Sequence, residues 1–192
     1  MIDTAAGLAI LCLLCAGILD LVFKLYAAVP RSRGMLIFGV GIVWGALQLG
    51  YVIYTDATTS FDSVTLSWGL AAAICVTVSN LLLLECMGHL PISMASTIYR
   101  LNTVPLVVFA FLFLGEDIDL VRSAGIALGI VTVLVLYTPG LQGSDRAKLS
   151  GVFFALIIVA SVIRALYGTF TKAGVNAGAD PDAMILLSLI HI

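Results

Sequence analysis

Long apolar runs dominate the chain, and short polar segments separate them. A helix needs about 20 mostly apolar residues to cross the hydrocarbon core of a membrane. Six runs approach or exceed that length, and we predict that they form membrane-spanning helices at residues 5–29, 35–54, 64–88, 92–114, 120–137 and 149–172. A seventh run begins near residue 183 and offers only about ten residues, which are too few to cross. The pattern predicts an all-α, polytopic transmembrane helix bundle.

The composition agrees with a chain that lies in lipid. Hydrophobic residues make up 61% of the sequence, charged residues only 10%, and the mean hydropathy is +1.17. A soluble domain is about 25% charged, so this chain has too little charge for a water-facing surface. Nine Lys and Arg against eleven Asp and Glu leave no basic field for a nucleic acid. The expected partner is the lipid bilayer, and the expected location is a bacterial inner membrane.

The loop charges predict how the chain is oriented. Arg31, Arg33, Arg146 and Lys148 lie in loops on one side of the predicted bundle, whereas most acidic loop residues lie on the side of the N-terminus. Loops rich in Lys and Arg usually stay in the cytoplasm. We therefore expect the basic side to be cytoplasmic and the N-terminus to be outside.

Three polar residues from three predicted spans lie at one depth. At about 1.5 Å per residue, Asp20 lies about 15 Å from Pro30, while Arg100 and Asn80 lie about 13 Å and 16 Å from Pro91. Charges at mid-membrane are costly and usually face the bundle interior or a cavity. We predict that Asp20 and Arg100 pair, either within a substrate or coupling-ion site or as a structural pair that fixes helix packing.

The fourth predicted span carries a polar face, whose members at helical spacing are Ser93, Ser96, Thr97, Arg100 and Thr103. Such a face lines water or another helix, although Ser and Thr also bond their own backbone carbonyls. Ser96 and Thr103 therefore join the candidate site. Tyr99 and Asn102 lie off this face and are expected to meet a neighbouring helix.

Charged and sulfur-containing residues elsewhere have simpler interpretations. Glu85 and His89 share one helical face near the end of a span, where an interfacial position is favoured over a proton relay. Lys24 is expected to extend to the headgroups. Cys12 and Cys15 have metal-like spacing but sit in an apolar helix without further ligands, so no metal site is expected.

Two pairs of glycines, Gly41 with Gly45 and Gly125 with Gly129, are spaced four residues apart. Small residues at this spacing allow transmembrane helices to approach closely. We therefore expect both pairs to mark close helix contacts.

An internal repeat relates the first predicted span to the sixth. A shift of 144 residues places Gly7 on Gly151 and Asp20 on Arg164. Five helices lie between the two starts, and an odd number inverts the second copy in the membrane. Arg164 would then lie about 12 Å from the opposite face, which adds it to the candidate site.

The same chain shows a family resemblance. Between Gly88 and Tyr137, characteristic residues follow in the order Pro91, Pro105, Gly115-Glu116, Gly125 and Gly129. With the small residues Ala16-Gly17 in the first span, this order resembles a repeat of the EamA-type transporters of the drug/metabolite transporter superfamily. It also resembles the last two helices of the related small multidrug resistance proteins. The resemblance implies ten helices in two inverted repeats, cytoplasmic termini and no cofactor. Residues 1–140 would form the first repeat, 141–149 a linker, and 150–186 the start of the second repeat.

The last six residues, 187–192, match the translation of CTGTCTCTTATACACATC, the mosaic-end adapter of transposase-based sequencing libraries. We expect them to be a non-native tail and the native sequence to end near Leu186. On this interpretation the chain is an incomplete transporter.

The resemblance and the mid-membrane polar residues predict a secondary active transporter that moves a small metabolite or drug-like solute by alternating access. The alternatives are a protein like the lipid-linked sugar flippases and a non-transporting structural membrane subunit. A homodimer is a further arrangement, because a five-helix repeat can pair with an inverted copy. No phosphate loop, catalytic triad or metal-hydrolase motif occurs in the sequence, so enzymatic activity is not expected.

Overall fold

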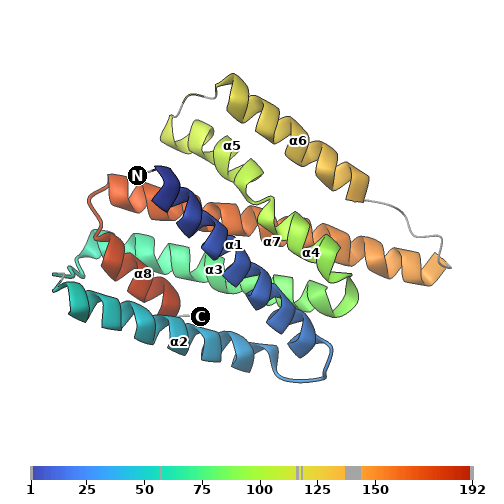
Figure 1. The fold of residues 1–192 in the computed structure, drawn as a ribbon, viewed down its shortest axis with the longest axis horizontal. Helices are drawn as coiled ribbons and strands as arrows, with labels where there is room; N and C mark the ends of the chain where they lie inside the picture. Colours follow the sequence, from blue (N-terminus) through green and yellow to red (C-terminus); the bar gives the residue numbers. More distant parts are fainter. Residues whose placement is uncertain (1, 57, 116, 118, 137–143, 191–192) are drawn as a thin grey trace.

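The computed structural model describes the chain except for residues 1, 57, 116, 118, 137–143 and 191–192. Every regular element in the described part is helical, and the elements are α1 (Ile2–Ala27), α2 (Arg33–Thr55), α3 (Ser63–His89), α4 (Ile92–Arg100), α5 (Thr103–Leu114), α6 (Leu120–Leu136), α7 (Ser144–Asn176) and α8 (Pro181–Ile190). Successive helices alternate in direction, apart from α4 and α5, which continue the same way (Figure 1). The prediction of an all-α bundle is confirmed for these residues.

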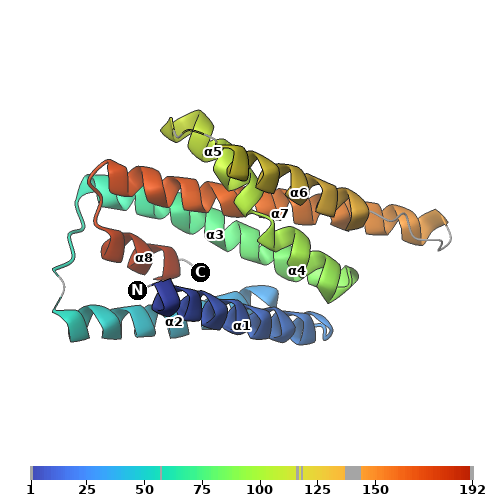
Figure 2. The same cartoon turned by 45° about the horizontal axis from the view of Figure 1, so that its top comes forward.

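Helices α3 and α7 form the centre of the molecule. They lie side by side in both views, and α8 packs against α3 and α2 (Figures 1 and 2). Helix α1 lies against α3 and α4, whereas α6 packs against α5 at the edge of the bundle. The buried residues Gly69, Ala72 and Ala73 give α3 a smooth surface that permits close packing.

The main cluster of buried apolar side chains joins α1, α2, α3, α4 and α7. It includes Phe23, Leu84, Ile98 and Ile157, all of which are less than a tenth exposed. Phe23 lies one helical turn from Asp20, so the polar residues of α1 face the same interior as its apolar anchor.

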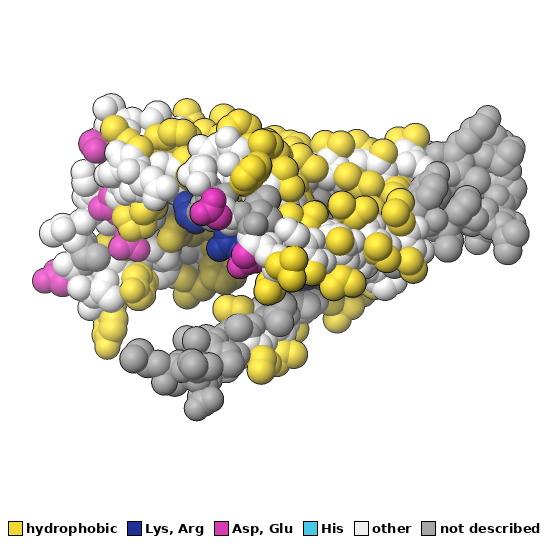
Figure 3. Space-filling model, turned by 90° about the horizontal axis from the view of Figure 1, so that it is seen from above, with side chains coloured by type: hydrophobic (Ala, Val, Ile, Leu, Met, Phe, Trp, Pro, Cys, Tyr) yellow, Lys and Arg dark blue, Asp and Glu magenta, His cyan; other side chains and the backbone are white. Residues whose placement is uncertain are grey.

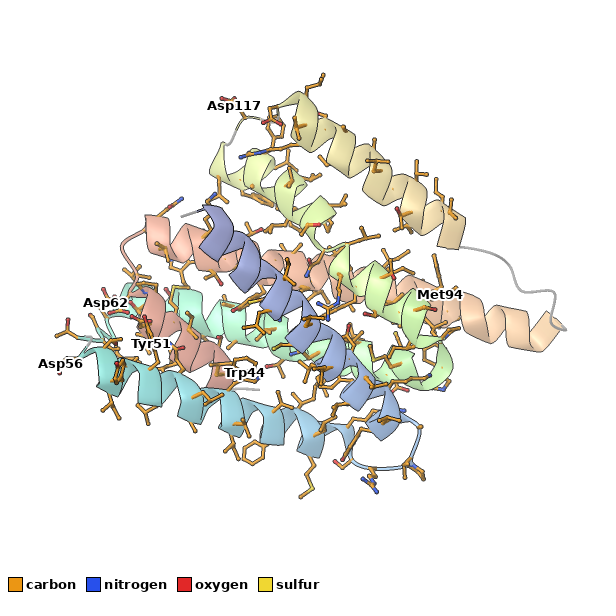
Figure 4. The ribbon with its side chains drawn as sticks, viewed as in Figure 1. Trp44, Tyr51, Asp56, Asp62, Met94 and Asp117 are labelled. Atoms are coloured by element: carbon orange, nitrogen blue, oxygen red, sulfur yellow. The ribbon has the colours of Figure 1, made fainter. Side chains whose placement is uncertain are left out.

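The apolar helices fit a multi-pass membrane protein. Five are long and apolar enough to cross a membrane, at residues 10–27, 33–55, 63–89, 92–114 and 151–176, and α6 is a shorter apolar helix. Hydrophobic side chains are spread over much of the face in Figure 3, and acidic side chains lie toward its left end. Asp56, Asp62 and Asp117 lie toward that same end in Figure 4. This separation of charge from apolar surface is what a bilayer requires.

The fourth predicted span differs from the expectation of one continuous helix. Residues Leu101 and Asn102 separate α4 from α5. Pro105 explains the interruption, because its ring nitrogen carries no N–H for the carbonyl of Leu101 and its ring crowds that carbonyl. The Leu101 carbonyl instead accepts a hydrogen bond of 2.9 Å from the backbone nitrogen of Val104.

Helix α7 also differs from the expectation, since it begins at Ser144, within the predicted linker of residues 141–149. Residues 144–149 are polar or charged apart from Ala147 and Leu149, and none is proline or glycine, so nothing in them opposes a helix that extends beyond the apolar run. The apolar pattern predicted the membrane-spanning part of α7 but not the residue at which this helix begins. The predicted end of the fifth span, at residue 137, lies outside the described residues.

Aspartates begin two helices at the acidic end. The carboxylate of Asp62 accepts a hydrogen bond of 2.8 Å from the backbone nitrogen of Thr65, and that of Asp180 accepts one of 3.0 Å from the backbone nitrogen of Ala183. Pro181, whose missing N–H costs nothing at the first helical position, follows Asp180 directly. These caps explain why α3 and α8 begin where they do, and α8 begins slightly before the predicted residue 183.

Candidate functional site

The centre of the candidate site is an ion pair between α1 and α4. The Nη2 and Nε atoms of Arg100 lie 2.6 Å and 3.0 Å from Oδ2 of Asp20, and the hydroxyl of Ser96 donates to the same oxygen. The side chain of Asp20 is 9% exposed, whereas that of Arg100 is 38% exposed. The predicted contact between Asp20 and Arg100 is confirmed, and the predicted member Ser96 belongs to it.

Helical spacing brings these groups together. Ser96 and Arg100 lie four residues apart on α4, so both reach the same side of that helix. Asp20 and Lys24 lie four residues apart on α1 and both make polar contacts with the α3–α4 region. Helix α1 is thus attached by two charged side chains on one face.

Tyr99 links the ion pair to α3. Its hydroxyl donates to Oδ1 of Asn80 at 2.8 Å and lies 3.3 Å from Oγ of Ser79. Tyr99 directly precedes Arg100 on α4, so its contacts with α3 lie beside the ion pair. The expectation that Tyr99 meets a neighbouring helix is therefore confirmed, and the predicted residue Asn80 enters the site through it.

Tyr99 belongs to the site although the polar face of the fourth predicted span did not include it, and the sequence contained one signal for it. A tyrosine in an apolar helix must satisfy its hydroxyl group. Asn80, on the preceding predicted span and at the predicted depth of the ion pair, was a polar side chain that could accept this hydrogen bond. Tyr99 is 9% exposed, which makes this hydrogen bond part of the interior.

The other two predicted members lie at the margin of the site. The guanidinium of Arg164, on α7, lies 4.9 Å from the centre of the Tyr167 ring. Thr103 is exposed in the first turn of α5, beyond the break that follows Arg100. The predicted polar face is therefore divided, with Ser96 and Arg100 directed to Asp20 and Thr103 outside their contacts.

Lys24 behaves differently from the expected extension toward the headgroups. Its Nζ donates to the carbonyl oxygens of Met87 and Leu90, at 2.6 Å and 2.9 Å. The last carbonyls of a helix lack partners within the helix and carry its partial negative charge. An ammonium group from α1 supplies that partner at the end of α3, immediately before Pro91.

The contacts at the end of α3 favour the interfacial interpretation of Glu85 and His89. Glu85 forms an ion pair with Arg33 at the start of α2. The His89 ring stacks on Phe153 with the ring centres 3.7 Å apart, and its Nδ1 lies 3.1 Å from the backbone oxygen of Glu85. Each side chain thus has a packing partner at the end of a span.

An apolar cavity of about 510 Å³ lies between α4, α5, α6 and α7. Ile98 and Leu101, which flank Tyr99 and Arg100 in sequence, form part of its wall, and Ser161 is its main polar contribution. The cavity therefore places apolar space next to the turn of α4 that carries the polar site.

The described residues contain no group of three or more His, Cys, Asp or Glu side chains that could hold a metal ion. All four cysteines are free, and Cys12 and Cys15 are exposed on α1. The chemistry of the site is that of hydrogen bonds and ion pairs.

Comparison with protein-family models, with curated proteins and with solved structures finds no match to the chain.

Proposed function

We propose that the protein is a secondary active transporter that moves a small metabolite or drug-like solute across a membrane by alternating access. The observation that carries this proposal is the ion pair of Asp20 and Arg100 at mid-span. Asp20 is almost fully enclosed, yet more than a third of the Arg100 side chain is exposed. Ionisable groups within membrane spans commonly mark substrate or ion pathways.

The open side of Arg100 suggests how a solute would bind. The hydrogen bonds described for Arg100 use Nε and Nη2, so its Nη1 group would meet a solute. Guanidinium groups recognise carboxylates and phosphates, and the Asp20 carboxylate would receive a cationic or hydroxyl group. Amino acids, nucleosides and amphiphilic cations are therefore the solute classes to test.

The arrangement of the helices supports an EamA-like organisation. Helices α1 and α7, which the internal repeat relates, run in opposite directions (Figure 1). Arg164, which corresponds to Asp20 in the predicted repeat, lies on α7. We propose that α1–α6 form one repeat and that α7 opens an inverted second one, in a bacterial inner membrane. A homodimer would offer a similar pairing of inverted copies.

A lipid-linked sugar flippase is the second candidate. The apolar cavity of about 510 Å³ beside the polar site favours it, because a lipid tail needs apolar space and the linked headgroup needs polar contacts. A structural subunit has less support, since packing alone does not require an exposed arginine at this depth.

Ligand binding tests the transporter proposal directly. The purified chain in detergent would be heated with amino acids, nucleosides or amphiphilic cations, since a ligand that binds only the folded state raises the melting temperature, Tm. We expect one class to raise the Tm of the wild type but not that of Asp20→Asn/Arg100→Gln. Arg122→Gln, at the acidic end, serves as the control and should respond like the wild type.

A solute that stabilises the wild type should then exchange across liposomes that contain the protein. If none of the three classes binds, or if the double variant binds as tightly as the wild type, the assignment of this site to transport is wrong. Stabilisation by a lipid-linked sugar alone would favour the flippase.

A further inference from the structure

A polar pocket lies at the end of the bundle opposite the acidic loops. It has a volume of about 630 Å³ and is formed by the α1–α2 turn, residues 27–33, together with Gly88 and His89 of α3. The pocket is separate from Asp20 and Arg100.

The charges around this pocket favour an anion. Arg33 is balanced by Glu85, with which it forms an ion pair. Arg31 is exposed and forms neither of the two ion pairs found in the described part of the chain. Its positive charge therefore faces the pocket without a carboxylate to neutralise it.

The backbone adds to this preference. Helix α2 begins beside the pocket, its N-cap Ser32 makes no side-chain capping bond, and its first turn contains no acidic residue. The positive end of a helix dipole attracts anions when its amide groups are open. Tyr26 holds the turn in place through a hydrogen bond of 2.9 Å to the Ser32 carbonyl, with Arg31 5.7 Å from the centre of its ring.

The position of the pocket indicates where the anion comes from. It lies where α1 and α3 end and α2 begins, which is the boundary between the apolar spans and water. Two exposed apolar residues, Val29 in the pocket lining and Met35 in the first turn of α2, would contact acyl chains. An anion carried at the end of acyl chains fits both features.

We propose that this pocket binds the phosphate of an anionic phospholipid, with Arg31 as its main cationic contact. Basic pockets between transmembrane helices recognise anionic headgroups in this way. The acyl chains would lie along the apolar flank, and the phosphate would sit between Arg31 and the start of α2. This proposal does not depend on the transport function, because none of its residues belongs to the Asp20 site.

Titration of the detergent-solubilised chain with dioctanoyl phosphatidylglycerol, followed by its Tm, tests the proposal. We expect a saturable rise in Tm for the wild type and an apparent Kd about fivefold weaker for Arg31→Gln, since one basic residue near the membrane surface contributes about that much. Arg31→Lys should retain most of the effect, which separates lost charge from lost fold. Arg122→Gln removes the same charge at the other end and should bind like the wild type.

Three results would overturn the proposal. Equal stabilisation by zwitterionic dioctanoyl phosphatidylcholine would show that headgroup charge does not matter. Equal weakening by Arg122→Gln would show an effect of net charge and not of the pocket. Equal affinity for soluble glycerol phosphate would show that the ligand is a free phosphate compound and not a lipid.

Discussion

The hydrogen bonds described for the Asp20 side chain are all accepted by one carboxylate oxygen, Oδ2. The hydroxyl of Ser96 donates one of them, and two nitrogen atoms of Arg100 donate the others. The two members of the pair differ in exposure, because Asp20 is enclosed and Arg100 is partly open. A charge that loses its partner costs most where water does not reach it. The contribution of the pair to stability should therefore be asymmetric.

We expect Arg100→Gln to destabilise the fold more than Asp20→Asn. Arg100→Gln strands the buried carboxylate, at a cost of about 3–5 kcal/mol for a broken buried pair, whereas Asp20→Asn leaves a guanidinium that can reach solvent. The double variant should recover folded protein because no charge is left unpaired. Yield of monodisperse protein and Tm provide the measurements.

The double-variant cycle also separates the two roles of the pair. If Asp20 and Arg100 only fix packing, the double variant should both fold and bind solute. If they contact the solute, folding returns without binding. Additive losses in the two single variants and the double would show that the residues do not interact, contrary to the geometry.

At the scale of elements, Pro105 has the largest effect on the site. Proline is tolerated in membrane helices because neighbouring groups satisfy the freed carbonyl, so its presence alone did not predict a break. The interruption at Leu101 and Asn102 separates Thr103 from Arg100. A helical face drawn from sequence assumes a straight helix, and that assumption fails after Arg100.

The two glycines of α6 provide a matched test of helix packing. A Cβ atom at Gly129 would lie 2.3 Å from Cγ2 of Val104 on α5, whereas one at Gly125 would meet nothing within 4 Å. Val104 is β-branched and has few alternative rotamers. The predicted close contact is therefore found at Gly129 and not at Gly125.

We expect Gly129→Ala to lower the free energy of unfolding by about 1–3 kcal/mol, the usual cost of overpacking. Gly125→Ala makes the same change in helix propensity without the clash, so the difference in Tm between the two variants isolates the α5–α6 contact. Equal Tm values would mean that α6 moves away from Val104 at little cost.

The cap of α8 should make stability depend on pH. The backbone N–H of Ala183 is the main group that holds the pKa of Asp180 below its usual value, and the N–H groups of Ser60 and Asp182 act in the same direction. A carboxyl group whose pKa is lower in the folded state stabilises the fold above its unfolded pKa, near 3.9, and that contribution is lost as the pH falls through the folded pKa.

We expect the wild type to have a higher Tm than Asp180→Asn at about pH 6, and the difference to close below about pH 4. Asparagine keeps an acceptor for the cap but has no charge, so the comparison isolates ionisation. A difference in Tm that stays constant across this range would show that Asp180 contributes no pH-dependent stability.

At the scale of the whole molecule, the sequence predicted the all-α bundle, the rough limits of most apolar helices and the pairing of Asp20 with Arg100, because length and the cost of buried charge constrain them. It predicted six spans, whereas five helical segments of the described residues are long enough to cross and α6 is shorter. It did not predict which helices pack together. Apolar faces are alike in sequence, so the central packing of α3 on α7 and the cap that Lys24 provides arise only in three dimensions.

The basic and acidic loops lie at opposite ends of the structure, so the orientation of the chain in a membrane can be tested. The α1–α2 turn, with Arg31 and Arg33, lies at one end, and the α2–α3 loop, with Asp56 and Asp62, lies at the other (Figures 1 and 4). The positive-inside rule places the first end in the cytoplasm. The EamA resemblance implies the opposite, because it places the N-terminus there.

Cysteine labelling of intact cells distinguishes these orientations. In a background where the four native cysteines are replaced by alanine, we expect a membrane-impermeant maleimide to label Thr58→Cys from outside but to label Ser32→Cys only after permeabilisation. Both positions are exposed in the structure, so each is a matched control for the other. Labelling of Ser32→Cys alone in intact cells would reverse the orientation and would place the basic pocket on the outer face. Labelling of both in intact cells would mean that the two loops do not lie on opposite sides of a membrane.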